Sequence, residues 1–318
     1  MKISPSEKSR TLFILNPKAG IPPVNTIIFQ DINRRKNLTC LKSLNVSDSE
    51  RLIKQNLENY DIFVAAGGDG TVHTIATELI GTKKILAVLP VGSGNGFAKE
   101  FGFRPNVRSL LNDIGKGDYV EIDAIEINDK LCLNVAGIGL DSFVAHSFNK
   151  LRLRGFIPYV ALTLRTFLFL RPFPVTILSG GREIVSENLF VLTIANTRQF
   201  GNNAFIAPDA LPDDGIIDIV LIRPFPKFMF MVFIYRLFTG RLRDSKYVRH
   251  IHTDKEVIIR TDETRFHIDG EPLKISGEVV VRIKRHALRV LKTAGNKRSQ
   301  SNGSGTVTEA DKGETAQL

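Results

Sequence analysis

YDIFVAAGGDGT, at residues 60–71, joins an apolar run to a glycine-rich turn, and ILAVLPVGSGNG, at residues 85–96, repeats the pattern further along the chain. Such apolar runs bounded by glycines predict buried strands, and the sequence after each turn is compatible with a helix. A strand, a glycine turn and a helix start bring backbone N–H groups around a phosphate. Two such turns in one small α/β unit predict a polyphosphate held between them, with the Asp69 carboxylate placed to hold a metal ion or its water.

The first part of the chain alternates predicted strands and helices, which is typical of a parallel sheet with helices on its faces. We expect strands at residues 11–15, 38–44, 60–66 and 85–91. We expect helices at residues 24–35, at 47–59 with Ser47 and Asp48 as the cap, from the first glycine turn to residue 80, and at 107–114. Residues 1–118 are therefore predicted to form an α/β nucleotide-binding domain.

From residue 119 onward predicted strands dominate, which favours a β-sandwich-like or barrel-like second domain over residues 119–295. The expected strands are 120–127, 130–136, 175–178, 188–195, 216–223, 256–260, 265–268 and 278–283, with helical inserts at 141–170 and 226–242. Residues 296–318 are rich in Ser, Gly, Thr and Glu and are predicted to be disordered.

The net charge of +10 favours an anionic partner. Charge alone does not decide whether this partner is a nucleotide, a nucleic acid or an anionic membrane. No stretch reaches the roughly 20 apolar residues of a membrane span. The segment 150–173 alternates arginines with Leu, Phe and Val, which favours a membrane surface over nucleic acid. A core helix with snorkelling arginines is the alternative.

The two cysteines, Cys40 and Cys132, fall in predicted strands and are expected to be buried, reduced thiols. The start, MKISPSEKSR, lacks the apolar core of a signal peptide. Both features predict a cytoplasmic protein.

Two acidic motifs lie in the second half of the chain. In FHIDGEP, at residues 266–272, Asp269 and Glu271 are two apart at a strand end and could point into one cleft, although an ordinary acidic turn is the alternative. In PDALPDDG, at residues 208–215, carboxylates before a glycine could hold a hard cation, with a solvated loop as the alternative. No Walker loop is present, so phosphate binding is expected to rely on backbone amides.

Five motifs together resemble the diacylglycerol kinase catalytic family, which includes bacterial soluble lipid kinases and sphingosine kinases, with NAD kinases as distant relatives. They are NPKAG at 16–20, GGDGT at 67–71, LPVGSGNGFA at 89–98, APDALPDDG at 207–215 and DGEP at 269–272. The resemblance implies a nucleotide-binding α/β domain, a β-sandwich-like domain and an active site in the interdomain cleft. It also implies transfer of the ATP γ-phosphoryl group to a lipid hydroxyl, of diacylglycerol or a sphingoid-type lipid.

The resemblance also implies roles for individual residues. Asp269 would be the general base with Glu271 beside it, and Asp69 would belong to a carboxylate–water–magnesium network. Asp214, with the carbonyls of Leu211 and Ile216, would hold a structural Mg²⁺. The residues that would bind ATP are Asn16, Ser43, Gly67, Gly68, Asp69, Gly70, Thr71, Gly92, Ser93, Gly94 and Asn95.

One position departs from the family pattern, because many bacterial relatives carry Asp where this chain has Gly96. Sphingosine-kinase-like members also lack that carboxylate, so the acceptor lipid stays open. We expect an ATP- and Mg²⁺-dependent lipid kinase that is peripheral at the inner membrane surface and binds no nucleic acid. A kinase of a soluble acceptor, as in NAD kinase, and a non-catalytic lipid- or nucleotide-binding regulator are the alternatives, and homodimer formation is left open.

Overall fold

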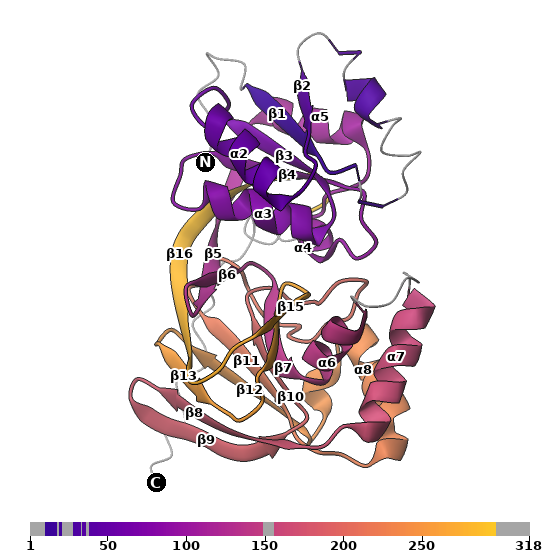
Figure 1. The fold of residues 1–318 in the computed structure, drawn as a ribbon, viewed down its shortest axis with the longest axis vertical. Helices are drawn as coiled ribbons and strands as arrows, with labels where there is room; N and C mark the ends of the chain where they lie inside the picture. Colours follow the sequence, from indigo (N-terminus) through magenta and orange to yellow (C-terminus); the bar gives the residue numbers. More distant parts are fainter. Residues whose placement is uncertain are drawn as a thin grey trace, which may run out of the picture.

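The computed structural model describes residues 10–17, 19, 20, 28–32, 34, 35, 38–148 and 156–296, which form two lobes (Figure 1). Apart from residue 296, the predicted tail lies outside the described residues, and so do residues 24–27 of the first predicted helix and residues 149–155 of the helical insert expected at 141–170. Among the described residues, no helix combines the length and the apolar character that a membrane crossing requires.

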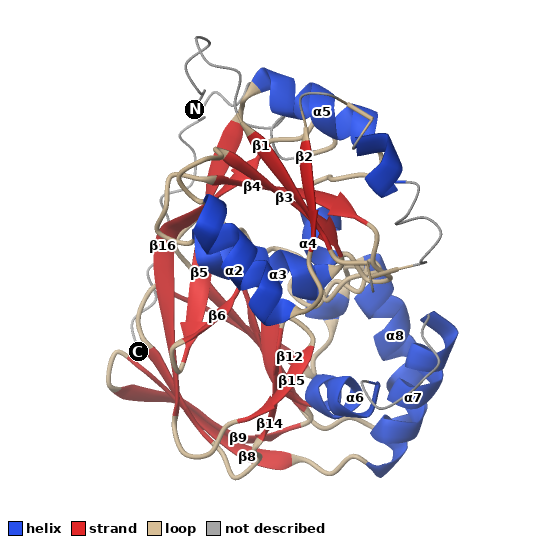
Figure 2. Ribbon diagram, turned by 45° about the horizontal axis from the view of Figure 1, so that its top comes forward, coloured by secondary structure: helices blue, strands red, loops and turns tan. Residues whose placement is uncertain are grey.

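The N-terminal lobe is built on four parallel strands in the order β2-β1-β3-β4, namely β1 (Thr11–Leu15), β2 (Thr39–Lys42), β3 (Ile62–Gly67) and β4 (Ile85–Pro90). β1, β3 and β4 are buried along their whole length, as their unbroken apolar sequence predicts for strands covered on both faces. The helices α2 (Val46–Asn56) and α3 (Asp69–Leu79) lie on one face and α5 (Val107–Lys116) on the other (Figure 2). The predicted parallel α/β arrangement is confirmed.

The start of α2 differs from the expectation. Asn45 caps this helix, and its side-chain oxygen accepts a hydrogen bond from the Asp48 backbone N–H at 2.9 Å. The predicted cap at Ser47 and Asp48 is wrong because both residues already lie in the first turn of the helix.

The C-terminal lobe packs two antiparallel layers face to face, which confirms the predicted β-sandwich-like class. One layer has the order β12-β11-β10-β7-β14-β15, and the other includes β13, β8 and β9 together with parts of β5 and β16. Their core includes Ile138 and Ile194 from the first layer and Ile177 and Val281 from the second. The remaining elements are β5 (Tyr119–Ile127), β6 (Lys130–Cys132), β7 (Val135–Gly139), α6 (Leu140–Phe148), α7 (Phe156–Phe169), β8 (Phe173–Ser179), β9 (Arg182–Leu189), β10 (Val191–Ala195), β11 (Ile217–Ile222), η1 (Lys227–Met229), α8 (Phe230–Thr239), η2 (Leu242–Asp244), β12 (Val248–Thr253), β13 (Val257–Arg260), β14 (Arg265–Ile268), β15 (Glu271–Lys274) and β16 (Val279–Leu291).

The strand expected at residues 130–136 is interrupted. It ends at Cys132 as β6 and resumes at Val135 as β7, so Leu133 and Asn134 lie between two strands. Their backbone N–H groups are thereby released from strand pairing and turn toward Asp269. This break contributes directly to the candidate site.

Strand β16 runs through both lobes (Figure 1). It pairs antiparallel with β5 along its length, while Arg289 and Val290 pair parallel with Ile85 and Leu86 of β4. A bulge between Lys284 and Leu288 turns the strand. The two lobes thus share one continuous sheet, and the division at residues 118 and 119 stays a prediction.

Candidate active site

The carboxyl ends of the four parallel strands gather the predicted nucleotide-binding residues at one edge of the sheet. Asn16 follows β1, and its Nδ2 donates to Thr71 Oγ1 at 3.2 Å. Ser43 follows β2, but it is only 2% exposed, so its side chain is not open to the cleft. Ligands in open α/β sheets bind at this edge.

The two glycine loops lie directly against each other. The Val91 N–H donates to the Gly67 carbonyl at 3.0 Å, and a Cβ on Gly92 would lie 2.5 Å from the Gly68 Cα. Asn95 stabilises the second loop, because its Oδ1 accepts from the Gly92 N–H at 3.1 Å and its Nδ2 donates to the Gly92 carbonyl at 2.7 Å. The loops therefore form one continuous backbone wall, in which Gly70 and Ser93 are exposed.

Gly92→Ala should weaken ATP binding at least tenfold, because its Cβ cannot coexist with Gly68 at 2.5 Å and the loops must separate. Isothermal titration with ATP measures this. Gly115→Ala is the matched control, since a Cβ there meets nothing within 4 Å and alanine favours the helix α5. Equal ATP affinity of the two variants would show that the contact between the loops does not shape the nucleotide site.

Asp69, in the first glycine loop, forms a hydrogen bond to the helix that follows the second glycine loop. Its Oδ1 accepts from the Phe97 backbone N–H at 3.2 Å, at the start of α4 (Gly96–Glu100). Burial raises the pKa of Asp69, the nearby backbone N–H groups of α4 oppose that shift, and the negative charge of Asp269 adds to it. The carboxylate thus lies between the two glycine loops, where the resemblance implies a contact to metal-bound water.

Gly96, where many bacterial relatives carry Asp, lies in a position with little room for a side chain. Gly96 is buried, and a Cβ there would lie 3.1 Å from the Phe200 carbonyl oxygen and 3.3 Å from the Gly201 Cα, both in the other lobe. An aspartate at this position would require the segment around Gly201 to move away.

The DGEP motif forms a tight hairpin turn between β14 and β15. Asp269 and Gly270 both have positive φ, of 51° and 85°, as the two central residues of a type I′ turn require. Glu271 begins β15, is exposed, and has its Oε1 3.4 Å from where a Cβ on Gly70 would lie. The hairpin therefore brings both predicted carboxylates to the first glycine loop.

The Asp269 carboxylate is buried and fully hydrogen-bonded. Its Oδ2 accepts from Leu133 N at 3.0 Å and is paired with His73 Nδ1 at 2.8 Å, while its Oδ1 accepts from Asn134 N at 2.8 Å and from Cys132 Sγ at 3.4 Å. Burial alone would raise the pKa of Asp269, but the bonds and charge of His73 and the two backbone donors lower it overall. With four donors on about four acceptor positions, the group is held ionised.

His73 is the site residue that sequence reasoning missed. It lies four residues after Asp69 on α3, hence on the same face, and its side chain is 30% exposed. Burial lowers the pKa of His73, but the bond to Asp269 and the charges of Asp269 and Glu271 outweigh that effect and raise it. No bond to its Nε2 occurs within the part of the chain that the structure describes, and the side chain is partly open to solvent.

The predicted cation loop forms a separate cluster. The Asp214 Oδ1 accepts from the Ile216 N–H at 2.9 Å, and the Gly215 N–H donates to Asp123 Oδ2 at 2.7 Å. Burial and the negative charges of Asp123 and Asp213 raise the pKa of Asp214. Among the described side chains, no three His, Cys, Asp or Glu residues are grouped as metal ligands, so a cation here would rely on backbone carbonyls such as those of Leu211 and Ile216.

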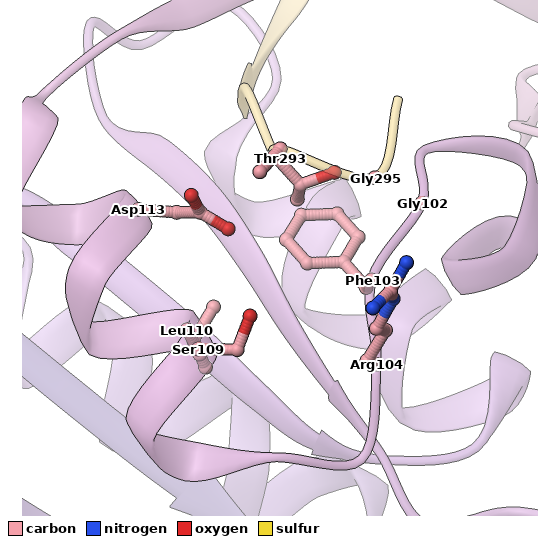
Figure 3. A pocket seen from close by; sticks show the side chains of 9 residues that line it. Gly102, Phe103, Arg104, Ser109, Leu110, Asp113, Thr293 and Gly295 are labelled. Atoms are coloured by element: carbon pink, nitrogen blue, oxygen red, sulfur yellow. The ribbon is translucent and has the colours of Figure 1, made fainter. Parts of the chain in front are cut away.

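A small hollow of about 80 Å³ lies between α5 and the residues that follow β16 (Figure 3). Ser109 and Asp113 of α5 line one side, and Thr293 and Gly295 line the other. None of the predicted site residues borders it, and its volume suits only a few water molecules.

Comparison with known proteins agrees with this architecture. Residues 10–127 match the diacylglycerol kinase catalytic domain, and residues 134–292 match the YegS C-terminal NAD kinase beta sandwich-like domain. A Mycobacterium tuberculosis protein named "Diacylglycerol kinase" is 33% identical over 168 residues, which is 51% of this chain and 54% of that protein. A Klebsiella pneumoniae protein named "Probable lipid kinase YegS-like" is 29% identical over 280 residues, covering 83% of this chain and 89% of that protein.

Solved structures show the same fold. A diacylglycerol kinase from Bacillus anthracis superimposes with a TM-score of 0.70 at 19% identity, covering 90% of this chain and 97% of that one. An NAD kinase from Archaeoglobus fulgidus in complex with ATP superimposes with a TM-score of 0.55 at 14% identity, covering 92% and 97%. The chain belongs to the family of proteins that carry a diacylglycerol kinase catalytic domain, here followed by a YegS C-terminal NAD kinase beta sandwich-like domain, and it shares its fold with the NAD kinase structure.

Proposed function

We propose that this protein is a lipid kinase that transfers the γ-phosphoryl group of ATP to the hydroxyl of a membrane lipid, diacylglycerol or a sphingoid-type lipid. The observation that carries the proposal is the pairing of His73 of the N-terminal lobe, one helical turn after Asp69 of the first glycine loop, with Asp269 of the C-terminal lobe. Phosphate-binding amides and a group that accepts a proton then face one space. Since ATP is a cytoplasmic substrate and the acceptor lies in a bilayer, we place the enzyme at the cytoplasmic face of the inner membrane.

The glycine loops would hold the ATP phosphates through backbone N–H groups. Phosphoryl transfer depends mainly on positioning and on neutralising the charge of the transferred group. Gly70 and Ser93 are exposed and Gly68, Gly92 and Gly94 are partly exposed, so phosphates could approach both loops. Asn16, bonded to Thr71 at the same edge, is placed to contact the nucleotide.

The proton of the acceptor hydroxyl would go to the His73–Asp269 pair. The resemblance implies Asp269 as the general base. Because the Asp269 side chain is only 2% exposed and already accepts from His73, Leu133, Asn134 and Cys132, we propose that it acts through His73, whose Nε2 would meet the hydroxyl. The O–H bond breaks, the proton passes to Nε2, the oxygen attacks the γ-phosphorus, and ADP leaves, while Asp269 holds the imidazole through Nδ1.

We propose two places at which residues of this chain would hold Mg²⁺ or its water. Asp214 with the carbonyls of Leu211 and Ile216 offers the hard oxygen donors that Mg²⁺ prefers, and the excess of carboxylates around Asp214 favours a cation. Asp69 is placed to bind water of an ion at the loops. When bound with ATP, Mg²⁺ neutralises phosphate charge.

Asp214→Ala should reduce activity severalfold and make the remainder depend more steeply on Mg²⁺, since a carboxylate ligand is lost. Thermal unfolding with and without Mg²⁺ gives a second readout, and the wild-type stabilisation by Mg²⁺ should shrink. Glu58→Ala, which removes an exposed carboxylate from the N-terminal lobe, is the control. If both variants give identical Mg²⁺ titrations, the loop at residues 208–215 is a solvated loop that holds no cation.

Label transfer from γ-labelled ATP tests the function. The acceptors are diacylglycerol and sphingosine in mixed micelles, and NAD in solution. Transfer to a lipid supports the proposal, and transfer to NAD alone would assign the protein to the soluble-acceptor kinases. ATP binding without transfer to any acceptor would make it a regulator on the same fold.

A further inference from the structure

Large apolar side chains are exposed together on two neighbouring helical segments of the C-terminal lobe. Seven of the ten exposed large hydrophobic residues among those described lie on α7 or on η1 and α8, namely Leu164, Leu168, Phe169, Phe228, Met231, Val232 and Tyr235. Phe228 is 84% exposed and Phe169 is 80% exposed. We call this set the apolar face. Folded proteins seldom expose such a cluster without a partner.

The apolar face is the outer side of a packed helix pair. Phe167 of α7 is fully buried, and its ring stacks on those of Phe225 and Phe230 with centroids 5.0 and 4.7 Å away. Phe169 lies two positions after Phe167, hence on the opposite side of α7, and is exposed. Figures 1 and 2 both show α7 and α8 side by side at one end of the lobe. Both helices are thus apolar on the buried and on the outer side, which is unusual for helices that face only water.

The two segments that carry the apolar face contain basic residues and no acidic ones. Residues 150–174 contain no Asp or Glu, and none lies between Asp218 and Asp244. Within the described residues, Arg165, Arg171, Arg236 and Arg241 have no carboxylate partner, unlike Arg223 and Arg243, which pair with Glu187 and Asp209. The charge is therefore available to a ligand.

A hollow of about 700 Å³ opens beside α7. Arg165 and Arg171 line it together with Phe143, Phe169 and Phe173. Arg265 also borders the hollow, but its guanidinium is bound to Glu263 and lies 3.7 Å from the ring centroid of Phe143. The hollow combines two available guanidinium groups with aromatic walls, which suits an anionic headgroup with an apolar chain.

We propose that the apolar face and the arginines around it dock the protein on an anionic phospholipid bilayer, with headgroups bound at Arg165 and Arg171. A second copy of this chain fits less well, because a symmetric contact would bring the unpaired arginines of both copies together. An anionic bilayer supplies both the apolar interior and the negative charge. This inference rests on the proposed function, in which the acceptor is a membrane lipid. Vesicle binding can nevertheless be measured without any phosphoryl transfer.

The docking surface is connected to the candidate active site through α6, which packs against α7. His146 of α6 lies with its Nε2 3.1 Å from the carbonyl oxygens of both Phe266 and Leu273, on the hairpin that carries Asp269. The Lys227 ammonium group contacts the Leu168 carbonyl and so joins η1 to α7. A bilayer bound at this face would therefore be held at a fixed distance from the cleft.

Sedimentation of the full chain with vesicles tests the proposal, using phosphatidylglycerol–phosphatidylcholine vesicles and pure phosphatidylcholine vesicles without ATP. The wild type should bind the anionic vesicles at low salt and dissociate at high salt. Phe228→Ser/Met231→Ser should raise the lipid concentration for half-binding about tenfold or more. Leu44→Ser/Val46→Ser, which removes two similarly exposed apolar side chains from the N-terminal lobe, is the matched control and should bind as the wild type does.

A second variant tests the charge independently. Arg165→Gln/Arg171→Gln should lose roughly tenfold in affinity for anionic vesicles and keep its weak binding to neutral ones. No binding of the wild type at low salt, or equal binding by the Phe228/Met231 variant and its control, would overturn the docking surface. So would a dimer in gel filtration that the Phe228/Met231 variant abolishes without any effect on vesicles. Vesicle binding without phosphoryl transfer to any lipid would instead overturn only the proposed function.

Discussion

Asp269→Asn should lower kcat by about 10²–10⁴-fold while ATP affinity stays within a few fold. The asparagine keeps the shape of the side chain but presents an NH₂ group where Asp269 Oδ2 now meets Leu133 N–H and His73 Nδ1. In this orientation His73 can satisfy the NH₂ group only by accepting at Nδ1, which moves its proton to Nε2, so that Nε2 cannot accept another. In the flipped orientation the NH₂ group meets the Asn134 N–H instead, and the neutral amide no longer stabilises a protonated His73. Steady-state kinetics at saturating ATP, with ATP binding measured separately, check this.

The same lobe offers a matched control for this substitution. Asp218 is also buried, and its Oδ1 lies 2.6 Å from His252 Nδ1 on β12, on a different edge of the sheet. Asp218→Asn should lose stability through the same change of bonding and retain kcat. A kcat near the wild-type value in the Asp269→Asn variant would refute the role of Asp269, and an equal loss in both variants would show that the effect is one of stability.

The glycine loops could be predicted from the sequence because their information is local. A buried apolar strand followed by glycines fixes its own conformation, and parallel strands place their carboxyl ends at one edge. The contact between Gly68 and Gly92 therefore follows from two short stretches. The sequence also paired Asp269 with Glu271, but it could not show that one carboxylate would be buried and the other exposed.

The rest of the site depends on contacts between distant residues. His73 and Asp269 are 196 positions apart, and only the packing of the two lobes brings them together. A lone histidine in a helix carries no pattern, so its position four residues after Asp69 was the one available signal. The strands β9, β12 and β15 were missed because they mix polar and apolar residues and are largely half-exposed or exposed.

The ionisation of His73 should set the pH dependence of the reaction. A base must be neutral, so kcat/KM should fall as the pH drops through the pKa of His73, which Asp269 and Glu271 raise above the usual value for histidine. The effect on stability has the opposite sign. The protonated imidazole stabilises the folded state fully below the pKa of the unfolded chain, and this contribution disappears as the pH rises through the raised pKa. The enzyme thus gains activity over the pH interval in which the ion pair weakens.

His73→Ala should lower kcat by about 10²-fold or more and abolish this acidic limb of the pH profile. The space left beside Asp269 should admit free imidazole, which can bond to the carboxylate and accept the proton, so added imidazole should restore part of the rate in proportion to its concentration and its neutral fraction. His252→Ala, which removes the partner of Asp218, is the control and should show neither the loss nor the rescue. A structural role for His73 would give a loss that imidazole does not repair. If the His73→Ala variant keeps the acidic limb and Glu271→Gln removes it, the proton goes instead to the exposed carboxylate beside Gly70, and the imidazole serves only to hold Asp269 in place.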